Sequence, residues 1–142
     1  MTIASILQGK GDKIISIART ASVAEAVALL TAKRIGALPV MDGDTVVGIF
    51  SERDVIRCLD SVGDAALGRS VDEVMTAPVE TVTPASSALG ALSLMTRRRI
   101  RHLPVIDGAR VVGFVSIGDL VKYRIDRIEA DAAAMRDYIQ SA

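Results

Sequence analysis

The stretch RIGALPVMDGDTVVGIFSERD, residues 34–54, recurs 65 residues later as RIRHLPVIDGARVVGFVSIGD, residues 99–119. Around this pair, residues 14–58 align with residues 79–123 without a gap, and 16 of the 45 aligned positions are identical. Similarity that continues this long without a gap indicates an internal repeat. Two copies of one structural unit therefore make up most of the 142-residue chain.

The first half of each copy predicts a strand followed by a helix. In copy one, Ile14–Ile17 is a short apolar strand candidate. Ser22 and Glu25, three residues apart, form a capping box that opens a helix. Gly36 is expected to end that helix, because glycine is the usual residue after a helix C-terminus.

The second half of each copy predicts a β-hairpin and a second helix. Strands are expected at residues 38–41 and 45–50, joined by a tight turn at Asp42-Gly43. Ser51 then starts the second helix, so the unit is β-α-β-β-α. A unit this small buries little surface alone, so we expect two of them to pack face to face around one core. The fold class is α/β (α+β), a pseudo-twofold pair.

The segments outside the repeats predict further helices. Ser70–Glu73 forms another capping box that opens a short helix, and Thr2–Leu7 is its N-terminal counterpart. After Tyr123, apolar residues recur in steps of three and four, a narrow stripe that suits packing against another helix across a dimer. These residues are Ile125, Ile128, Ala132, Met135 and Ile139. The expected units are residues 1–62, residues 63–124 and a C-terminal helix at 125–142.

Composition narrows the class of protein and its partners. Seventeen basic residues balance seventeen acidic ones, which gives no electrostatic case for nucleic acid or an anionic membrane. The single cysteine, Cys58, cannot form an intrachain disulfide, which fits a reducing compartment. There is no apolar run of about 18 residues and no signal-peptide pattern. A soluble cytoplasmic protein is expected.

The order Leu-Pro-Val, Asp-Gly, Gly-x-x-Ser-x-x-Asp, present in both copies, resembles the CBS (cystathionine β-synthase) domain pair, or Bateman module. The resemblance covers about Ile3 to Tyr123. It implies a regulatory module that binds an adenosine-containing ligand in two clefts between the units. The ligands expected are AMP, ADP or ATP, with NAD(H) or S-adenosylmethionine as further candidates. It also implies a disc-shaped homodimer that senses energy or redox state and acts on a regulated protein partner.

The Ser-x-x-Asp motif carries the chemistry of the candidate sites. Ser51 and Ser116 stand where a strand enters a helix N-terminus, whose free N–H groups and dipole suit phosphate. An ionised aspartate accepts two hydrogen bonds and matches the adjacent hydroxyls of a ribose. The resemblance implies that ribose role for Asp54 and Asp119. The resemblance also implies one adenine slot at Ala37, Leu38 and Pro39 and another at His102, Leu103 and Pro104. Backbone groups of Ile17–Thr20 and of Val82–Ala85, including Val82 and Thr83, would bond to the adenine edge.

A second reading of Ser-x-x-Asp needs no ligand. Serine caps the helix and the acid reaches back to the cap N–H, which contributes about 1 kcal/mol to helix stability. The two copies also differ, because Arg53 in the first is replaced by Gly118, after Ile117, in the second. Arg53 either contacts a phosphate or is a solvated surface residue, whereas Gly118 lets a ligand approach the backbone closely. Two non-equivalent sites are therefore expected.

The densest charge run is residues 97–102. Arg97 and Arg98 are expected to be solvated cations at a helix C-terminus. Arg101 and His102 either contact a ligand phosphate or are also surface residues. No run of metal ligands or phosphate-loop motif is present, and nothing predicts catalysis. The first hypothesis is a nucleotide-binding regulatory module, and the alternative is a scaffold or interaction protein that has the CBS fold but binds no nucleotide. An enzyme is the third hypothesis, although no motif in the sequence supports it.

Overall fold

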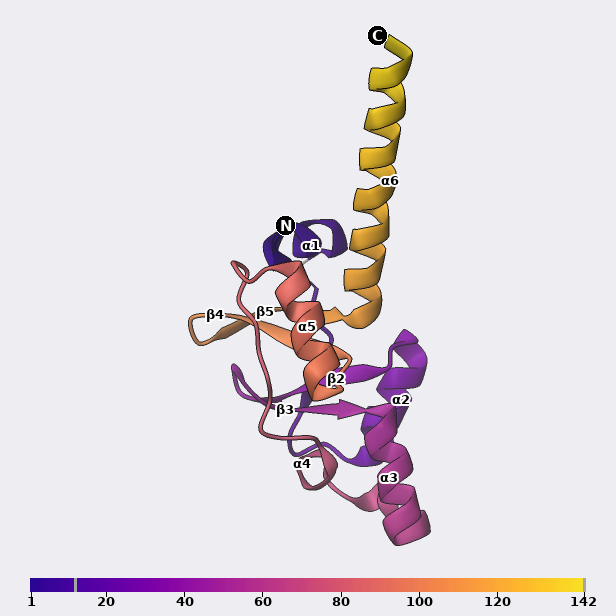
Figure 1. Ribbon diagram of the computed structural model, residues 1–142. Coiled ribbons are helices and arrows are strands. Elements are labelled where there is room, and N and C mark those ends of the chain that lie inside the picture. The colour runs from indigo at the N-terminus through magenta and orange to yellow at the C-terminus, as the bar shows by residue number, and fades with distance from the viewer. Residues whose placement is uncertain (12, 142) are drawn as a thin grey trace.

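The computed structural model describes residues 1–11 and 13–141. Two repeats lie one above the other, and a long C-terminal helix projects from the end that carries the second repeat (Figure 1). The elements are α1 (Ile3–Lys10), β1 (Ile17–Ala18), α2 (Val23–Lys33), β2 (Ala37–Asp42), β3 (Thr45–Ser51), α3 (Glu52–Val62), the 3-10 helix η1 (Gly63–Gly68), α4 (Val71–Val74), α5 (Ala88–Arg98), β4 (His102–Asp107), β5 (Arg110–Ser116) and α6 (Ile117–Ser141).

The expected strand-helix-hairpin-helix order is present in repeat 1. Strand β1 pairs in parallel with β2, and β2 pairs antiparallel with β3. Two expectations about this sheet were wrong in detail. The first strand is only Ile17–Ala18, and the hairpin loop is Gly43-Asp44 because Asp42 still pairs with Thr45. Gly43 has φ +62°, the left-handed conformation that glycine adopts without strain.

Repeat 2 has the same hairpin in the same register. Strands β4 and β5 pair antiparallel, with an irregularity between Val105 and Ile106 that matches the one between Val40 and Met41. In place of a counterpart to β1, a single parallel bridge joins Val82 to Val105. The mixed α/β architecture predicted from the repeat is confirmed.

Helix α2 begins as predicted and ends differently. Ser22 accepts a hydrogen bond from the N–H of Glu25, and the Glu25 carboxylate accepts one from the N–H of Ser22. The expectation that Gly36 ends the helix was wrong, because Arg34 takes the left-handed conformation instead, with φ 54°. Ile35 N–H then donates to Leu30 C=O, as in a Schellman ending.

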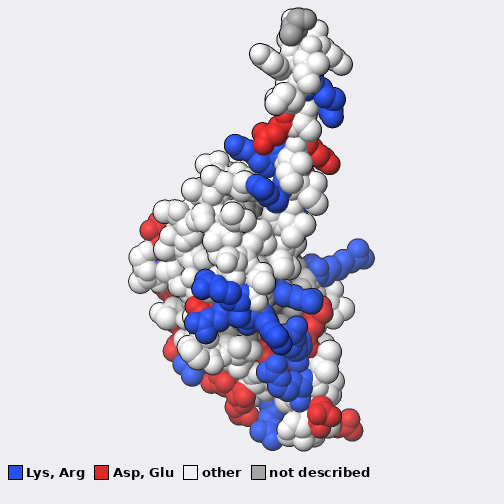
Figure 2. Space-filling model, viewed as in Figure 1, with Lys and Arg blue, Asp and Glu red and all other residues white. Residues whose placement is uncertain are grey.

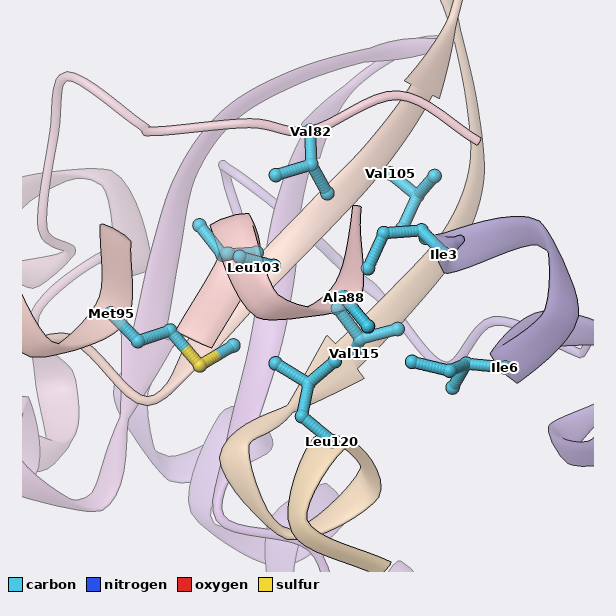
Figure 3. Packing of buried hydrophobic residues seen from close by; sticks show 10 residues of the cluster. Ile3, Ile6, Val82, Ala88, Met95, Leu103, Val105, Val115 and Leu120 are labelled. Carbon is cyan, nitrogen blue, oxygen red and sulfur yellow. The ribbon is translucent and has the colours of Figure 1, made fainter. Parts of the chain in front are cut away.

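The buried apolar side chains form two clusters, one per repeat, and not the single shared core that was expected. Each cluster is completed by the helix that precedes the other repeat. Ile3 and Ile6 of α1 pack among Val105, Val115 and Leu120 in repeat 2 (Figure 3). Val71 of α4 packs with the core of repeat 1. The chain thus passes from one repeat to the other twice, once after α1 and once after α4.

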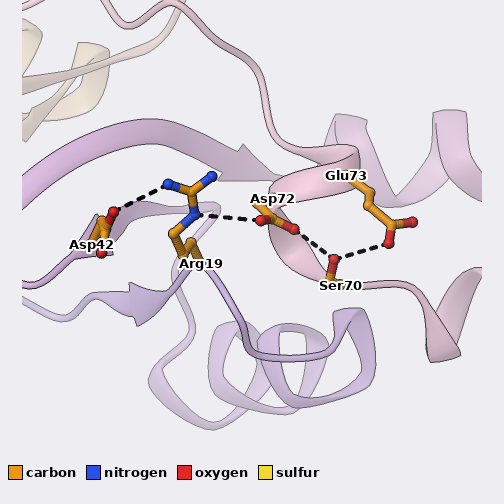
Figure 4. A network of polar contacts seen from close by, with 5 residues as sticks. All are labelled: Arg19, Asp42, Ser70, Asp72 and Glu73. Carbon is orange, nitrogen blue, oxygen red and sulfur yellow. Dashed lines mark hydrogen bonds and ion pairs between the residues drawn. The ribbon is translucent and has the colours of Figure 1, made fainter.

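Helix α4 is held against repeat 1 by a polar network (Figure 4). Arg19 bridges Asp42 and Asp72, at 3.1 and 3.3 Å. Ser70 Oγ donates to Asp72 at 2.6 Å and to Glu73 at 3.2 Å, so the capping box expected at Ser70 does not form. The hydrogen bond from Ser70 lowers the pKa of Asp72, and burial opposes it.

Helix α6 runs unbroken from Ile117 to Ser141. The second helix of repeat 2 and the C-terminal helix expected at residue 125 are therefore one helix. Leu120 is its one fully buried residue among those described, and Tyr123 packs against the core of repeat 2.

Candidate functional site

A cavity of about 670 Å³ lies where the two repeats meet. That volume is in the range of pockets that hold small molecules. Repeat 1 contributes the end of β3 and the start of α3, while repeat 2 contributes the segment before its first strand and the turn from α5 to β4. The lining residues are Gly36, Ile49, Ser51, Glu52, Arg53, Asp54, Ile56, Arg57, Thr76, Pro78, Val79, Glu80, Arg98, Arg99, Ile100, Arg101 and His102.

Asp54 is the one buried charged residue among those described, at 1% exposure. One carboxylate oxygen accepts hydrogen bonds from Ser51 N–H at 2.9 Å and Ser51 Oγ at 3.2 Å. The other accepts from Thr76 Oγ1 at 2.9 Å and lies 3.6 Å from Arg57. The bond from Ser51 N–H is the half of the capping box that the acid supplies, while the Ser51 hydroxyl donates to the same carboxylate.

Asp119 is more open and has a different partner. It accepts from Ser116 N–H at 2.8 Å, and its own N–H donates to Ser116 Oγ at 3.1 Å. Lys10 Nζ lies 2.6 Å from the same carboxylate and also donates to Phe114 C=O at 2.5 Å. Partial burial would raise the pKa of Asp119, but the bonds from Lys10 and Ser116 together lower it.

Each of the two aspartates is bonded by a residue at or just after the end of the helix that covers its repeat. Asp54 of repeat 1 is bonded by Thr76, which comes after α4, whereas Asp119 of repeat 2 is bonded by Lys10 at the end of α1. Since α4 packs on repeat 1 and α1 packs on repeat 2, each aspartate is linked to the helix that covers its own repeat.

Two glycines make room for these crossing segments. A Cβ at Gly48 would lie 2.5 Å from Met75 Sδ and 2.9 Å from the backbone oxygen of Thr76. A Cβ at Gly113 would lie 2.5 Å from Leu7 Cδ2. The recurring glycine therefore allows close packing beside each Ser-x-x-Asp motif, against backbone at Gly48 and against the end of a side chain at Gly113.

The cavity carries more positive than negative charge. Five arginines face three carboxylates among its lining residues. Lys and Arg side chains gather across the middle of the molecule, where the repeats meet (Figure 2). Arg97 and Arg98 are exposed, as expected, but Arg98 Nε also lies 3.4 Å from Glu80 Oε1 in the cavity wall.

His102 lies where the cavity meets the second motif. Its ring stacks on Phe114, with centroids 5.5 Å apart and 12° between planes. Burial lowers the pKa of His102, and the nearby positive charge of Lys10 lowers it further. The imidazole is therefore neutral at pH 7.

The structure brings together part of the predicted set. Ser51, Arg53 and Asp54 share the cavity with Arg101 and His102 of the other repeat. The predicted residues that do not line it are either strand residues of the repeat cores or turn residues beside them. These are Ile17, Thr20, Ala37, Leu38, Pro39, Val82, Thr83, Leu103 and Pro104. Ser116, Ile117, Gly118 and Asp119 form the start of α6, where Lys10 meets them.

Sequence reasoning missed the crossing segments. Thr76, Pro78, Val79 and Glu80 line the cavity, and Lys10 bonds to Asp119. Thr76 and Lys10 lie outside the aligned residues 14–58 and 79–123, so no shared motif marks them. The one usable signal was the recurring Gly48 and Gly113, which indicates a close approach of backbone or side chain.

Comparison with known proteins identifies the family. The family model described as CBS domain matches residues 11–61 and again residues 71–126. The chain belongs to the CBS domain family. It is a tandem CBS pair, a regulatory module, as the resemblance implied.

Related CBS proteins match nearly the whole chain. The mitochondrial CBS domain-containing protein CBSX3 of Arabidopsis thaliana is 32% identical over 148 residues, covering 98% of this chain and 72% of the relative. A crystal structure of a CBS-domain containing protein from Agrobacterium tumefaciens is 36% identical with a TM-score of 0.84, covering 87% of this chain and 99% of that one.

Two structural neighbours hold adenosine compounds. The CBS domain pair of protein MJ0100 is in complex with 5′-methylthioadenosine and S-adenosylmethionine, at 25% identity and TM-score 0.79 over 89% of this chain and 98% of that one. CBSX2 is in complex with AMP, at 25% identity and TM-score 0.73 over 88% of this chain and 96% of that one. Within residues 1–11 and 13–141, no helix is long and apolar enough to cross a bilayer, and no His, Cys, Asp or Glu cluster could hold a metal ion.

Proposed function

We propose that this CBS pair binds an adenosine phosphate, AMP, ADP or ATP, and signals energy state as a homodimer. The observation that carries the proposal is the position of Ser51 and Asp54 at the N-terminus of α3, inside an arginine-lined cavity of about 670 Å³. Asp54 accepts the ribose hydroxyls, and the helix N-terminus with Arg53 and Arg101 binds the phosphate. The complexes of CBS relatives with AMP and with S-adenosylmethionine support an adenosine ligand.

The response follows from an exchange of hydrogen bonds. Both oxygens of Asp54 already have protein partners, so the ribose takes the place of the Thr76 hydroxyl. Thr76 continues from α4, whose Val71 is buried in the core of repeat 1. Occupancy of the cavity therefore shifts the segment that joins the repeats, and a ligand favours the arrangement to which it binds more tightly.

A second ligand site at Asp119 would be non-equivalent to the first. Lys10 occupies the carboxylate of Asp119 at 2.6 Å, where repeat 1 has the neutral Thr76. A ligand there either displaces this ammonium group or uses it as a phosphate partner. Gly118 provides close backbone approach in place of the Arg53 charge. Weaker binding at this cleft follows, because an ion pair must be rearranged.

Calorimetry tests the assignment with a matched pair of variants. Asp54→Asn keeps the shape of the side chain but removes the charge that accepts two ribose bonds, while Asp60→Asn changes an exposed carboxylate on the same helix. Charge-assisted hydrogen bonds are worth about 1.5–3 kcal/mol, so AMP affinity should fall about 10- to 100-fold in Asp54→Asn alone. The panel includes ADP, ATP, NAD(H) and S-adenosylmethionine. If no ligand binds the unaltered chain at millimolar concentration, the sensor proposal is wrong.

The alternative function is that of a scaffold with no nucleotide ligand. It is favoured by the same carboxylates, because Asp54 and Asp119 already serve as helix-capping groups with protein partners. A mass spectrum of small molecules released from purified protein separates the two functions. A released adenosine compound supports the sensor, and its absence together with flat calorimetry supports the scaffold.

A further inference from the structure

Helix α6 carries most of the exposed apolar surface of the described residues. Of twelve large hydrophobic side chains exposed there, seven lie on α6. They are Ile117, Val121, Ile125, Ile128, Met135, Tyr138 and Ile139. The outer part of the helix stands clear of both repeats (Figure 1), and there Met135, Tyr138 and Ile139 are 59%, 72% and 65% exposed. Most helix stability in proteins comes from packing of an apolar face, so this exposed apolar face indicates that a partner covers it.

The apolar side chains follow a heptad pattern. From Val121 the steps are four, three, four, three and four residues, through Ile125, Ile128, Ala132, Met135 and Ile139. Strict alternation of three and four gives the 3.5-residue repeat of a coiled coil, with Val121, Ile128 and Met135 at d and the others at a. The exposed fraction rises from 49% at Ile125 to 65% at Ile139.

We propose that α6 pairs with α6 of a second copy of this chain as a parallel, in-register, two-stranded coiled coil. The charges beside the stripe select this partner. In a parallel pair, each g residue faces the e residue of the following heptad on the partner helix. Arg124 then faces the partner's Glu129, and Asp131 faces the partner's Arg136, and symmetry forms each pair twice.

The opposite orientation is disfavoured by the same charges. An antiparallel pair that keeps a opposite d places e opposite e, so Lys122 would face the partner's Arg136 and Glu129 would face the partner's Glu129. Like charges at these positions repel. The e and g charges of α6 therefore complement those of an identical helix that runs in the same direction, which identifies the partner as a second copy of the chain. The two CBS pairs lie side by side at one end of the coiled coil, which spans about 30 Å for three heptads.

Cysteine pairing tests the orientation in the full chain. In a Cys58→Ser background, Ala132→Cys places a thiol at a core position, while Ala130→Cys is the matched control on the outer face of the same helix. Mild oxidation is expected to link Ala132→Cys into a covalent dimer and to leave Ala130→Cys as single chains. Equal linking of both variants, or a heterodisulfide preference when Ala132→Cys is mixed with Ile128→Cys, would overturn the parallel register.

Charge reversal tests the partner selection independently of any ligand. Glu129→Arg should weaken dimerisation about five- to twenty-fold in sedimentation equilibrium, because it makes two repulsive pairs with Arg124. Adding Arg124→Glu should restore the dimer. Asp126→Arg, at an outward position, is the control and should leave the dissociation constant unchanged. A monomeric unaltered chain, or no rescue by the double variant, would refute the proposal, whatever the outcome of nucleotide binding.

Discussion

The two Ser-x-x-Asp aspartates should contribute unequally to stability, although the sequence makes them equivalent. Asp54→Ala removes a carboxylate whose side chain is 2% exposed and which accepts from Ser51 and Thr76. Asp119→Ala removes one that is 27% exposed, where water can replace the lost contacts. We expect the first substitution to cost clearly more folding free energy than the second.

The contacts set the size of this difference. In Asp54→Ala the Ser51 N–H and the Ser51 hydroxyl lose their part-buried acceptor, and an unpaired donor shielded from water costs about 1–3 kcal/mol, whereas the hydroxyl of the exposed Thr76 can bond to water. The expected loss is about 3–4 kcal/mol. Asp119→Ala loses a helix cap worth about 1 kcal/mol and a half-exposed ion pair with Lys10 worth at most about 1 kcal/mol. At about 2–4 °C per kcal/mol for a domain of this size, the melting temperatures of the two variants should differ by about 4–8 °C.

Urea unfolding followed by circular dichroism measures both losses on the same scale. Asp60→Ala, an exposed acid on α3, is the control and should change stability by less than about 0.5 kcal/mol. Equal losses for the two aspartates would refute the reasoning, because burial and the Thr76 bond would then contribute nothing. A larger loss for Asp119→Ala would show that the Lys10 pair stabilises the fold more than the buried network does.

Three smaller predictions follow from other contacts. Gly48→Ala should destabilise the protein by about 1–3 kcal/mol in thermal melts, because the new Cβ would lie 2.9 Å from the Thr76 backbone oxygen. Gly9→Ala is the control, because it has open space within α1, and it should stabilise the protein by up to about 1 kcal/mol. Burial and, to a smaller extent, Lys10 lower the pKa of His102 in the folded protein. The unfolded chain therefore binds a proton at higher pH than the folded protein does, and stability is lost as the pH falls below about 6.5. His102→Gln should reduce this loss, which urea unfolding at pH 7.5 and 5.5 measures. Arg34→Gly should leave stability unchanged or raise it by up to about 1 kcal/mol in urea unfolding, because the residue has φ 54°, and a clear loss would contradict this.

The repeated elements could be predicted from the sequence because their signals are local. The capping box at Ser22 and Glu25, the hairpin and the helix after Ser51 all depend on residues a few positions apart. The crossing of α1 and α4 could not be predicted in the same way. Ile3 and Ile6 of α1 are spaced like Val71 and Val74 of α4, so the pattern of apolar residues does not show which repeat each helix covers.

The candidate site, like the fold, could be predicted only in part. Ser51 and Asp54 come from the recurring motif, Arg101 and His102 come from the charge run at residues 97–102, and the four meet at one cavity. Thr76 was missed because its role depends on the path of the chain between repeats, which no motif records. The strand segments expected as adenine slots are largely buried within the cores, since an apolar run that could line a slot is also what a buried strand requires.

The capping and ligand interpretations of the motif use the same oxygen atoms, and this overlap bears on regulation. If Asp54 pointed freely into the cavity, a ribose would bind it without changing any other contact. Asp54 instead accepts a hydrogen bond from Thr76, on the segment that leads from one repeat to the other. A ligand that takes this bond must overcome its free energy, which weakens binding, and Thr76 is then held to repeat 1 through its two backbone hydrogen bonds with Ile49 and no longer through its side chain. The same bond that lowers affinity thus couples occupancy to the arrangement of the repeats, because a ligand shifts an equilibrium only through its differential affinity for the two states.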